Sequence, residues 1–408
     1  MAEKLKKSPE HKENTMIIKP KTRGFICTTA HPAGCAGNVE MQAEYAAGHP
    51  VKGPKRVLVV GSSTGYGLAS RITAAFSCGA DTIGVYFDRP SSGNRTATAG
   101  WYNNQAFEKQ ARAAGHIAES INGDAFSDEV KKQTIELIKE KLPGGKLDLV
   151  IYSVASPRRI DPKTGETYNS VLKPIGKTFS GRTVNFHTGE ISQVEVEPAS
   201  QKEIDETVAV MGGEDWFLWM QALKDADVLA ENAGTTAFSY IGPALTHAVY
   251  TDGTIGQAKA DLEKKAVQID KLLEDISGKA FVSVNKGLVT QSSAAIPVVP
   301  LYIALLFKVM KDAGTHEGCI EQTVRMFEDF LYKTDDFKDV RVDEAGRIRL
   351  DDLEMQENIQ KKVAEKWNSI TTENLMQETD IAGYRRDFFN LFGFEVDGVD
   401  YEEDIQDF

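Results

Sequence analysis

The fold is decided by the stretch Val60-Gly61-Ser62-Ser63-Thr64-Gly65-Tyr66-Gly67, which lies between a short apolar run and a helical pattern. The run at 56–60 is typical of a buried strand, and residues 68–76 have the apolar spacing of a helix. Glycine lets the backbone approach a pyrophosphate closely, and the start of a helix supplies free N–H groups and a positive dipole end. The motif alone is weak, but its position between a first strand and a first helix predicts a dinucleotide-binding loop.

Strand and helix patterns continue to alternate after this loop. Further strands are expected at 82–87, 116–121, 147–153, 235–240 and 280–285, and helices at 101–114 and 128–141. Ser127 is the expected N-cap of the second of these helices. The alternation predicts an α/β fold with a Rossmann-like, doubly wound parallel sheet of the extended short-chain dehydrogenase type.

The rest of the chain adds to this core without a dividing linker. We expect a disordered tail at 1–15 and a single NAD-binding domain at 16–408. An insertion at about 156–230 begins with β-hairpins, and Ser200 with Glu203 forms a capping box that opens a long helix. The region at about 315–408 is expected to be mainly helical, with a short β-like segment at 341–350.

Composition limits the function classes. The chain has 408 residues, a net charge of −13, 41% apolar and 26% charged residues, which is typical of a globular protein and argues against nucleic-acid binding. The apolar stretch 294–310 contains Pro297, Pro300 and Lys308, so it predicts a buried helix and no membrane span. The four cysteines show neither disulfide nor metal-site spacing, and we expect no metal and a reducing cytoplasm.

Two acidic residues follow expected strands. Phe87-Asp88 ends the second strand, where a carboxylate accepts hydrogen bonds from the adenosine ribose and repels a 2′-phosphate. This favours NADH over NADPH, although Arg89 partly offsets the repulsion. Asp124 follows the third strand, where it either reaches the adenine or only shapes the turn into the next helix.

A reductase of this fold needs a donor for the oxygen that becomes negative during hydride transfer. Tyrosine serves when a lysine ammonium lowers its pKa and also holds the nicotinamide ribose. The familiar Tyr-x3-Lys spacing does not occur convincingly after the fourth strand, but Tyr250 and Lys259 are nine positions apart. That spacing places them on opposite faces of a straight helix, so they converge only if the chain bends at 251–253, a strong turn signal.

Several long blocks together resemble the FabV-type enoyl-acyl-carrier-protein reductases and the related trans-2-enoyl-CoA reductases. The blocks that carry the resemblance run from 17 to 386, and we take it to cover nearly the whole chain except 1–15. The sequence blocks that show the resemblance are Ile17-Ile18-Lys19-Pro20, Gly100-Trp101-Tyr102-Asn103-Asn104, Met211-Gly212-Gly213-Glu214-Asp215-Trp216, Ser239-Tyr240-Ile241-Gly242-Pro243, the Tyr-x8-Lys pair, Phe281–Thr290 and Gly383-Tyr384-Arg385-Arg386.

The resemblance implies roles for individual residues. Tyr250 corresponds to the proton donor, Lys259 to the cofactor-binding lysine, and Tyr240 to a second tyrosine that contacts the substrate. The implied NAD-binding residues are Gly61, Ser62, Ser63, Thr64, Gly65, Tyr66, Phe87, Asp88, Asp124, Ala125, Val154, Ala155, Lys259, Leu288, Val289 and Thr290. Two positions depart from the family pattern, Val154 in place of leucine and Asp88 in place of glutamate, and the second makes the NADH preference less secure.

The implied reaction is the NADH-dependent reduction of the C2=C3 bond of a 2-enoyl thioester, carried by coenzyme A or acyl carrier protein, in fatty acid synthesis. The helix at 294–310 forms either one wall of an acyl slot or part of the core. We expect a cytoplasmic monomer, because the insertions cover surfaces that smaller relatives of this fold use for assembly. A ketoreductase of the short-chain type and a non-catalytic NAD-sensing protein remain as alternatives, and the Tyr250–Lys259 pair with its unusual spacing counts against both.

Overall fold

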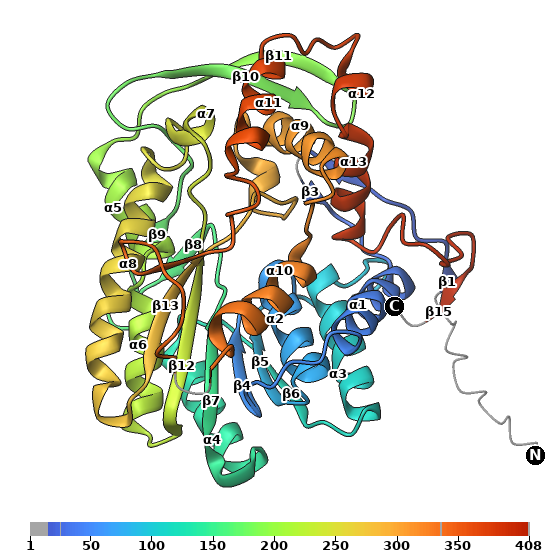
Figure 1. Cartoon of the computed structure of the whole chain (residues 1–408). Coiled ribbons are helices and arrows are strands. Elements are labelled where there is room, and N and C mark those ends of the chain that lie inside the picture. The colour runs from blue at the N-terminus through green and yellow to red at the C-terminus, as the bar shows by residue number, and fades with distance from the viewer. Residues whose placement is uncertain (1–14, 25, 335–336, 407–408) are drawn as a thin grey trace, which may run out of the picture.

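The fold was analysed in a computed structural model, which describes residues 15–24, 26–334 and 337–406 (Figure 1). The tail expected at 1–15 lies outside the described residues except for Thr15, which pairs with Gln406 across two short strands. No helix of the described chain is long and apolar enough to cross a bilayer.

A seven-stranded sheet forms the centre of the molecule. Its strands, in the order β14-β13-β12-β7-β4-β5-β6, all run parallel to their neighbours. Their bounds are β4 Arg56–Val60, β5 Asp81–Tyr86, β6 Ala118–Asn122, β7 Leu147–Tyr152, β12 Leu229–Ser239, β13 Lys279–Val284 and β14 Arg347–Arg349. The chain order reverses between β4 and β7, which is the switch point where doubly wound sheets bind their ligands. The predicted doubly wound parallel sheet is therefore confirmed.

Alternate residues of β4 face the two helical layers. Leu58 and Val60 pack with α4, α6 and α8, whereas Val57 and Val59 belong to the core on the opposite face of the sheet. Figure 1 shows α4, α6 and α8 on one side of the sheet and α1, α2, α3 and α10 on the other. The helices are α1 Pro32–Ala47, α2 Gly65–Ile72, α3 Ala99–Ala113, α4 Asp128–Lys141, α5 Gln201–Met211, α6 Glu214–Asp225, α7 Ala244–His247, α8 Thr254–Leu272, α9 Val299–Asp312, α10 Cys319–Arg325, α11 Glu357–Trp367, α12 Leu375–Glu378 and α13 Ile381–Asn390.

A cap lies over the carboxyl ends of the strands. It consists of α9, α11, α12, α13 and the hairpin of β10 (Phe179–Asn185) with β11 (Glu190–Val196), at the top of Figure 1. The residues 299–307 of α9 are all buried, which confirms a buried helix there. A second hairpin joins β8 (Arg158–Ile160) and β9 (Thr167–Asn169), so the predicted hairpin region is present.

One prediction about helix length needs correction, and the short β-like segment predicted at 341–350 is confirmed. The capping box of Ser200 and Glu203 is present, but α5 ends at Met211. The helix stops because Gly212 and Gly213 break it, and α6 starts again at Glu214. The short β-like segment at 341–350 contains β14, which is the edge strand of the central sheet, and therefore belongs to the core as well as interrupting the helices.

Candidate active site

A cavity of about 650 Å³ opens where β4, β5, β7 and β12 end, beneath α9. Its wall includes the glycine loop on one side and Tyr240, Tyr250 and Lys259 on another. Apolar side chains of the cap, Ile296, Val299, Ile303 and Leu391, close a further part of it. The cavity thus joins a polar cradle to an apolar slot at the switch point of the sheet.

The glycine loop is shaped by close backbone contacts. Gly61 has a φ of +87°, and a Cβ added there would lie 2.3 Å from the carbonyl oxygen of Ser153. A Cβ on Gly67 would lie 1.8 Å from the carbonyl oxygen of Gly61. These two glycines allow the first turn of α2 to pack against β4 and β7, which leaves its N–H groups directed at the cavity. The residues therefore fit the pyrophosphate of a dinucleotide.

Asp88 lies beside this loop. Its Oδ2 accepts a hydrogen bond of 2.7 Å from the Ser63 hydroxyl, and the amide of Asn122 contacts its backbone on both sides. A Cβ on Gly100 would lie 2.3 Å from Asp88 Oδ2, so only glycine lets the start of α3 approach this closely. The carboxylate is consequently held at the end of β5, where an adenosine ribose would lie.

The turn after β6 is supported from below by a buried ion pair. Lys131 Nζ lies 2.7 Å from Asp215 Oδ1 and also donates to the carbonyl oxygens of Ala125 and Phe126. Asp124 Oδ1 accepts a hydrogen bond from the N–H of Phe126 and so shapes the turn, while the residue also lines the cavity. Both readings of Asp124 are compatible with this geometry.

Tyr250 and Lys259 lie on either side of a bend, as their spacing predicted. Tyr250 lies within the turn that follows α7, Gly253 is the N-cap of α8, and Lys259 lies in the second turn of α8. Lys259 Nζ donates a hydrogen bond of 2.9 Å to the carbonyl oxygen of Phe238 on β12. Both side chains line the same cavity.

The pKa of Tyr250 differs from the expectation that a lysine ammonium lowers it. Burial of the phenol raises the pKa of Tyr250. Burial also lowers the pKa of Lys259, to about 8. The expected lowering fails because the phenol is enclosed by apolar groups of the core and desolvation favours its neutral form. Tyr250 therefore keeps its proton at neutral pH, as a hydrogen-bond donor must.

Most of the residues implied by the family resemblance line this cavity. Tyr240, Tyr250 and Lys259 do so together with Gly61, Ser63, Thr64, Gly65, Tyr66, Phe87, Asp88, Asp124, Ala125, Val154, Ala155, Leu288 and Thr290. Ser62 and Val289 do not belong to its wall as described. The hydroxyl of Ser62 donates inward to the carbonyl oxygen of Val85, and Val289 packs in the core.

Several residues of the cavity or its surroundings received no role from the sequence, among them Lys286, Leu391 and Glu354. Lys286 lies inside a quoted family block but received no role, and Leu391 reaches the cavity from the C-terminal region. Glu354 is fully buried, and its carboxylate accepts a hydrogen bond from the Tyr240 hydroxyl. No periodicity or motif marks Glu354, since it lies in the irregular segment between β14 and α11.

Family models match three consecutive parts of the chain. Residues 95–332 match the model described as trans-2-enoyl-CoA reductase catalytic region, and residues 17–93 match the NAD(P)H binding domain of trans-2-enoyl-CoA reductase. Residues 342–405 match a model described as an enoyl reductase FAD binding domain.

Similar proteins and structures agree with these matches. The trans-2-enoyl-CoA reductase [NADH] of Ruminiclostridium cellulolyticum is 58% identical over 96% of this chain and 98% of its own length. The enoyl-[acyl-carrier-protein] reductase [NADH] of Coxiella burnetii is 59% identical over 96% of each chain. The Treponema denticola trans-2-enoyl-CoA reductase in complex with NAD is 51% identical, with a TM-score of 0.91 over 96% of this chain and 98% of that one.

The residues at 342–405 do not fit a flavin dinucleotide in the way that the loop at 60–67 fits a dinucleotide. The junction between β14 and α11, at 350–356, contains no glycine and carries the carboxylates of Asp351, Asp352 and Glu354. Carboxylates repel a pyrophosphate, and side chains keep it from the backbone. We therefore assign no flavin chemistry to this segment.

Proposed function

This chain belongs to the trans-2-enoyl-CoA reductase family, and we propose that it uses NADH to reduce the C2=C3 bond of trans-2-enoyl thioesters to the saturated acyl thioesters. The observation that carries the proposal is the shared cavity, in which Tyr250 and Lys259 line one wall and the glycine loop lines another. A donor phenol, a lysine and a dinucleotide cradle are the parts that a conjugate reduction requires.

The donor role falls to Tyr250. Bound NADH supplies the hydride that is added to C3 of the enoyl chain. The phenol of Tyr250 donates a hydrogen bond to the thioester oxygen as negative charge develops there, and C2 of the resulting enolate then takes a proton that comes from solvent. Its raised pKa suits this role, because the phenol is protonated at neutral pH before the substrate arrives. A donor of this kind contributes about 3 kcal/mol to the stabilisation of the transition state.

Lys259 and Tyr240 complete the reacting part of the site. We propose that Lys259 binds the nicotinamide ribose. An ammonium group beside the ribose orients the cofactor, and its hydrogen bonds to the ribose offset the cost of burying the charge. Tyr240 contacts the substrate from the end of β12, and its ring lies edge to face against Tyr250, with centroids 5.0 Å apart. The two rings together define the place of the thioester group.

The cofactor is held along the carboxyl ends of β4, β5 and β6. We assign the pyrophosphate to the loop at 61–66, the adenosine ribose to Asp88, and the adenine to Asp124 with Ala125. Val154, Ala155 and the segment at 288–290 lie toward the nicotinamide. The carboxylate of Asp88 favours NADH, because a 2′-phosphate would meet a negative charge.

The acyl chain is assigned to the apolar slot under the cap. Val299 and Ile303 come from α9, and Leu391 follows α13, so the predicted helix contributes both to the core and to the wall of the cavity. Neither carrier is excluded by the site, since coenzyme A and acyl carrier protein present the same phosphopantetheine arm. We further infer a role in fatty acid synthesis, for a cytoplasmic enzyme in which residues 16–408 form one domain and act as a monomer.

The test is a comparison of substrates with the purified chain. Oxidation of the reduced nicotinamide is followed by absorbance in three mixtures. The first contains NADH and crotonyl-CoA, the second NADH and acetoacetyl-CoA, and the third NADPH and crotonyl-CoA. The proposal predicts rapid turnover with NADH and crotonyl-CoA, and little with the other two mixtures. Turnover of acetoacetyl-CoA instead would indicate a ketoreductase, and NADH binding without any turnover would indicate a sensor.

A further inference from the structure

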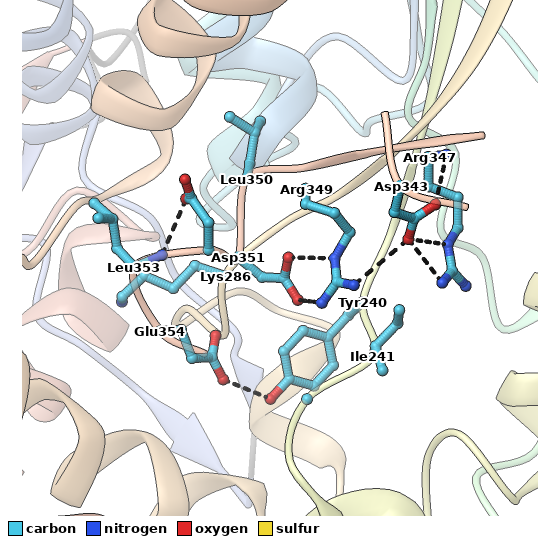
Figure 2. Close-up of polar contacts among 12 residues, drawn as sticks. Tyr240, Ile241, Lys286, Asp343, Arg347, Arg349, Leu350, Asp351, Leu353 and Glu354 are labelled. Carbon is cyan, nitrogen blue, oxygen red and sulfur yellow. Dashed lines mark hydrogen bonds and ion pairs between the residues drawn. The ribbon is translucent and has the colours of Figure 1, made fainter. Parts of the chain in front are cut away.

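A buried carboxylate lies behind the substrate tyrosine. Glu354, in the segment between β14 and α11, has a relative exposure of 0%. Figure 2 shows its carboxylate facing the hydroxyl of Tyr240, which comes from the end of β12. Two chain segments more than a hundred residues apart thus meet at this hydrogen bond, directly next to the candidate active site.

Three groups donate hydrogen bonds to this carboxylate. Glu354 Oε1 accepts from the Tyr240 hydroxyl at 3.1 Å and from the Tyr302 hydroxyl at 2.6 Å. Oε2 accepts from the backbone N–H of Gly287 at 2.7 Å. A carboxylate only accepts hydrogen bonds, so three donors around one carboxyl favour its ionised form.

The charges around Glu354 explain how an anion is kept there. Asp351, its buried neighbour, is already neutralised by a bidentate ion pair with Arg349, which Figure 2 shows. Within the described chain, Glu354 has no cation within ion-pair distance, and the positive charge of Lys286 acts on it from farther away. The stability of the Glu354 anion therefore depends on the two phenol protons, on the Gly287 amide and, from farther away, on the charge of Lys286.

We propose that Glu354 is a positioning residue that holds the hydroxyl proton of Tyr240, so that the thioester oxygen receives its hydrogen bond from Tyr250 alone. The proposal rests on the proposed function, because it divides labour between the two tyrosines of that reaction. A phenol has one proton, and that of Tyr240 is directed at Glu354. Within the described chain, no protein group accepts a hydrogen bond from the Tyr250 hydroxyl, which therefore remains available to the substrate.

Protonation of Glu354 disrupts this arrangement. A neutral carboxyl is a weaker hydrogen-bond acceptor than a carboxylate, so protonated Glu354 holds the Tyr240 hydroxyl less firmly. The groups that face Glu354 are Tyr240 from β12, Tyr302 from α9, Lys286 and the Gly287 amide from the loop after β13, and Asp351 from its own segment. Burial raises the pKa of Glu354. Wild-type kcat is expected to fall as the pH drops through this raised pKa.

The first experiment measures kcat and KM against pH for the wild type, Glu354→Gln, Tyr240→Phe and the double variant. We expect Glu354→Gln to lower kcat about tenfold or more, as for loss of a hydrogen bond to a charged group, and to remove the acid-side fall. In the Tyr240→Phe background the same change has little further effect, since Glu354 acts through that hydroxyl. Glu357→Gln is the matched control, because it neutralises an exposed carboxylate three residues away.

Tyr302→Phe shows how much of any effect comes from the second phenol. If Glu354→Gln does not fold, the Tyr240→Phe variant alone tests the proposal. Its kcat should then no longer fall at low pH, because the hydroxyl through which Glu354 acts is missing. An unchanged pH profile in both Glu354→Gln and Tyr240→Phe overturns the proposal, as does an equal loss of kcat from Glu354→Gln with and without Tyr240.

A second experiment does not depend on turnover. Ultraviolet titration of tyrosine, with the matching Tyr240→Phe protein subtracted, follows the ionisation of Tyr240. Burial and the charge of Glu354 raise the pKa of Tyr240 well above its ordinary value. The Tyr240 phenol should therefore ionise at lower pH in Glu354→Gln than in the wild type. If the wild type failed to reduce crotonyl-CoA, the proposed function would be wrong, and this titration would still decide the contact: an unchanged curve contradicts it.

Discussion

The rings of Tyr240 and Tyr250 meet edge to face, with centroids 5.0 Å apart and an angle of 80° between their planes. One hydroxyl donates to the buried carboxylate of Glu354, and the other has no protein acceptor within the described chain. Two similar phenols at one cavity thus have different surroundings, from which we propose different parts for them in the reaction.

The donor role of Tyr250 is tested by Tyr250→Phe. Removing the hydroxyl should cut kcat at least about a hundredfold, because about 3 kcal/mol of oxyanion stabilisation is lost. The affinity for NADH, measured by fluorescence titration, should change little. A variant with wild-type kcat would contradict the assignment.

The charge of Lys259 should determine how kcat/KM for NADH changes at alkaline pH. Its pKa is lowered to about 8, so its positive charge is present below that pH and is lost as the pH rises through it. The kcat/KM for NADH should decline above about pH 8, and Lys259→Ala should weaken both NADH binding and turnover at every pH. Lys259→Met, which keeps most of the side-chain volume, should show no such decline. If kcat/KM declined equally in Lys259→Met, the decline would come from the ionisation of another group.

The glycine loop predicts a difference between two alanine substitutions. A Cβ on Gly67 would lie 1.8 Å from the Gly61 carbonyl oxygen, so Gly67→Ala must displace the loop and should abolish detectable NADH binding. Gly48, at the C-cap of α1, has a negative φ and a nearest contact of 3.4 Å, which makes Gly48→Ala the control. Equal NADH affinity in the two variants would show that the loop does not hold the cofactor.

The charge of Asp88 should determine the preference for NADH over NADPH. Asp88→Asn keeps the shape and removes the charge, so the ratio of kcat/KM for NADPH to that for NADH should rise about tenfold, as expected for removal of one repulsive charge. The measurement is steady-state kinetics with both cofactors. No change in the ratio would mean that the 2′-position lies away from this carboxylate.

Stability depends on the Lys131–Asp215 ion pair beneath the turn after β6. Asp215 and Lys131 are almost fully buried, with side-chain exposures of 2% and 6%. Asp215→Asn leaves the ammonium without its counter-charge and should lower the free energy of unfolding by about 3 kcal/mol. Asp225→Asn, an exposed change at the end of the same helix, should cost less than about 0.5 kcal/mol in denaturant titration. Equal losses in the free energy of unfolding for the two variants would show that the buried ion pair does not stabilise the fold more than an exposed carboxylate does.

Local patterns predicted much of the central sheet. The strand at 56–60 coincides with β4, and the Ser127 cap is present, with its hydroxyl accepting from the N–H of Val130. Such features depend on a few neighbouring residues, which is why composition and spacing reveal them. The bend at 251–253 could be predicted for the same reason, since a turn signal and helical periodicity together leave few alternatives.

Contacts between distant segments could not be predicted in this way. The partnership of Tyr240 with Glu354 spans 114 positions, and nothing near either residue encodes it. The raised pKa of Tyr250 was missed for a related reason, because the sequence suggests a neighbouring ammonium but gives no measure of burial. Long-range packing decides both properties.

The most direct test of the account follows the path of hydrogen. Crotonyl-CoA is reduced with NADH that carries deuterium in its transferred position, and the butyryl-CoA product is analysed by NMR. We expect deuterium at C3 and a hydrogen from solvent at C2. Deuterium at C2, or a 3-hydroxyacyl product in place of butyryl-CoA, would contradict it.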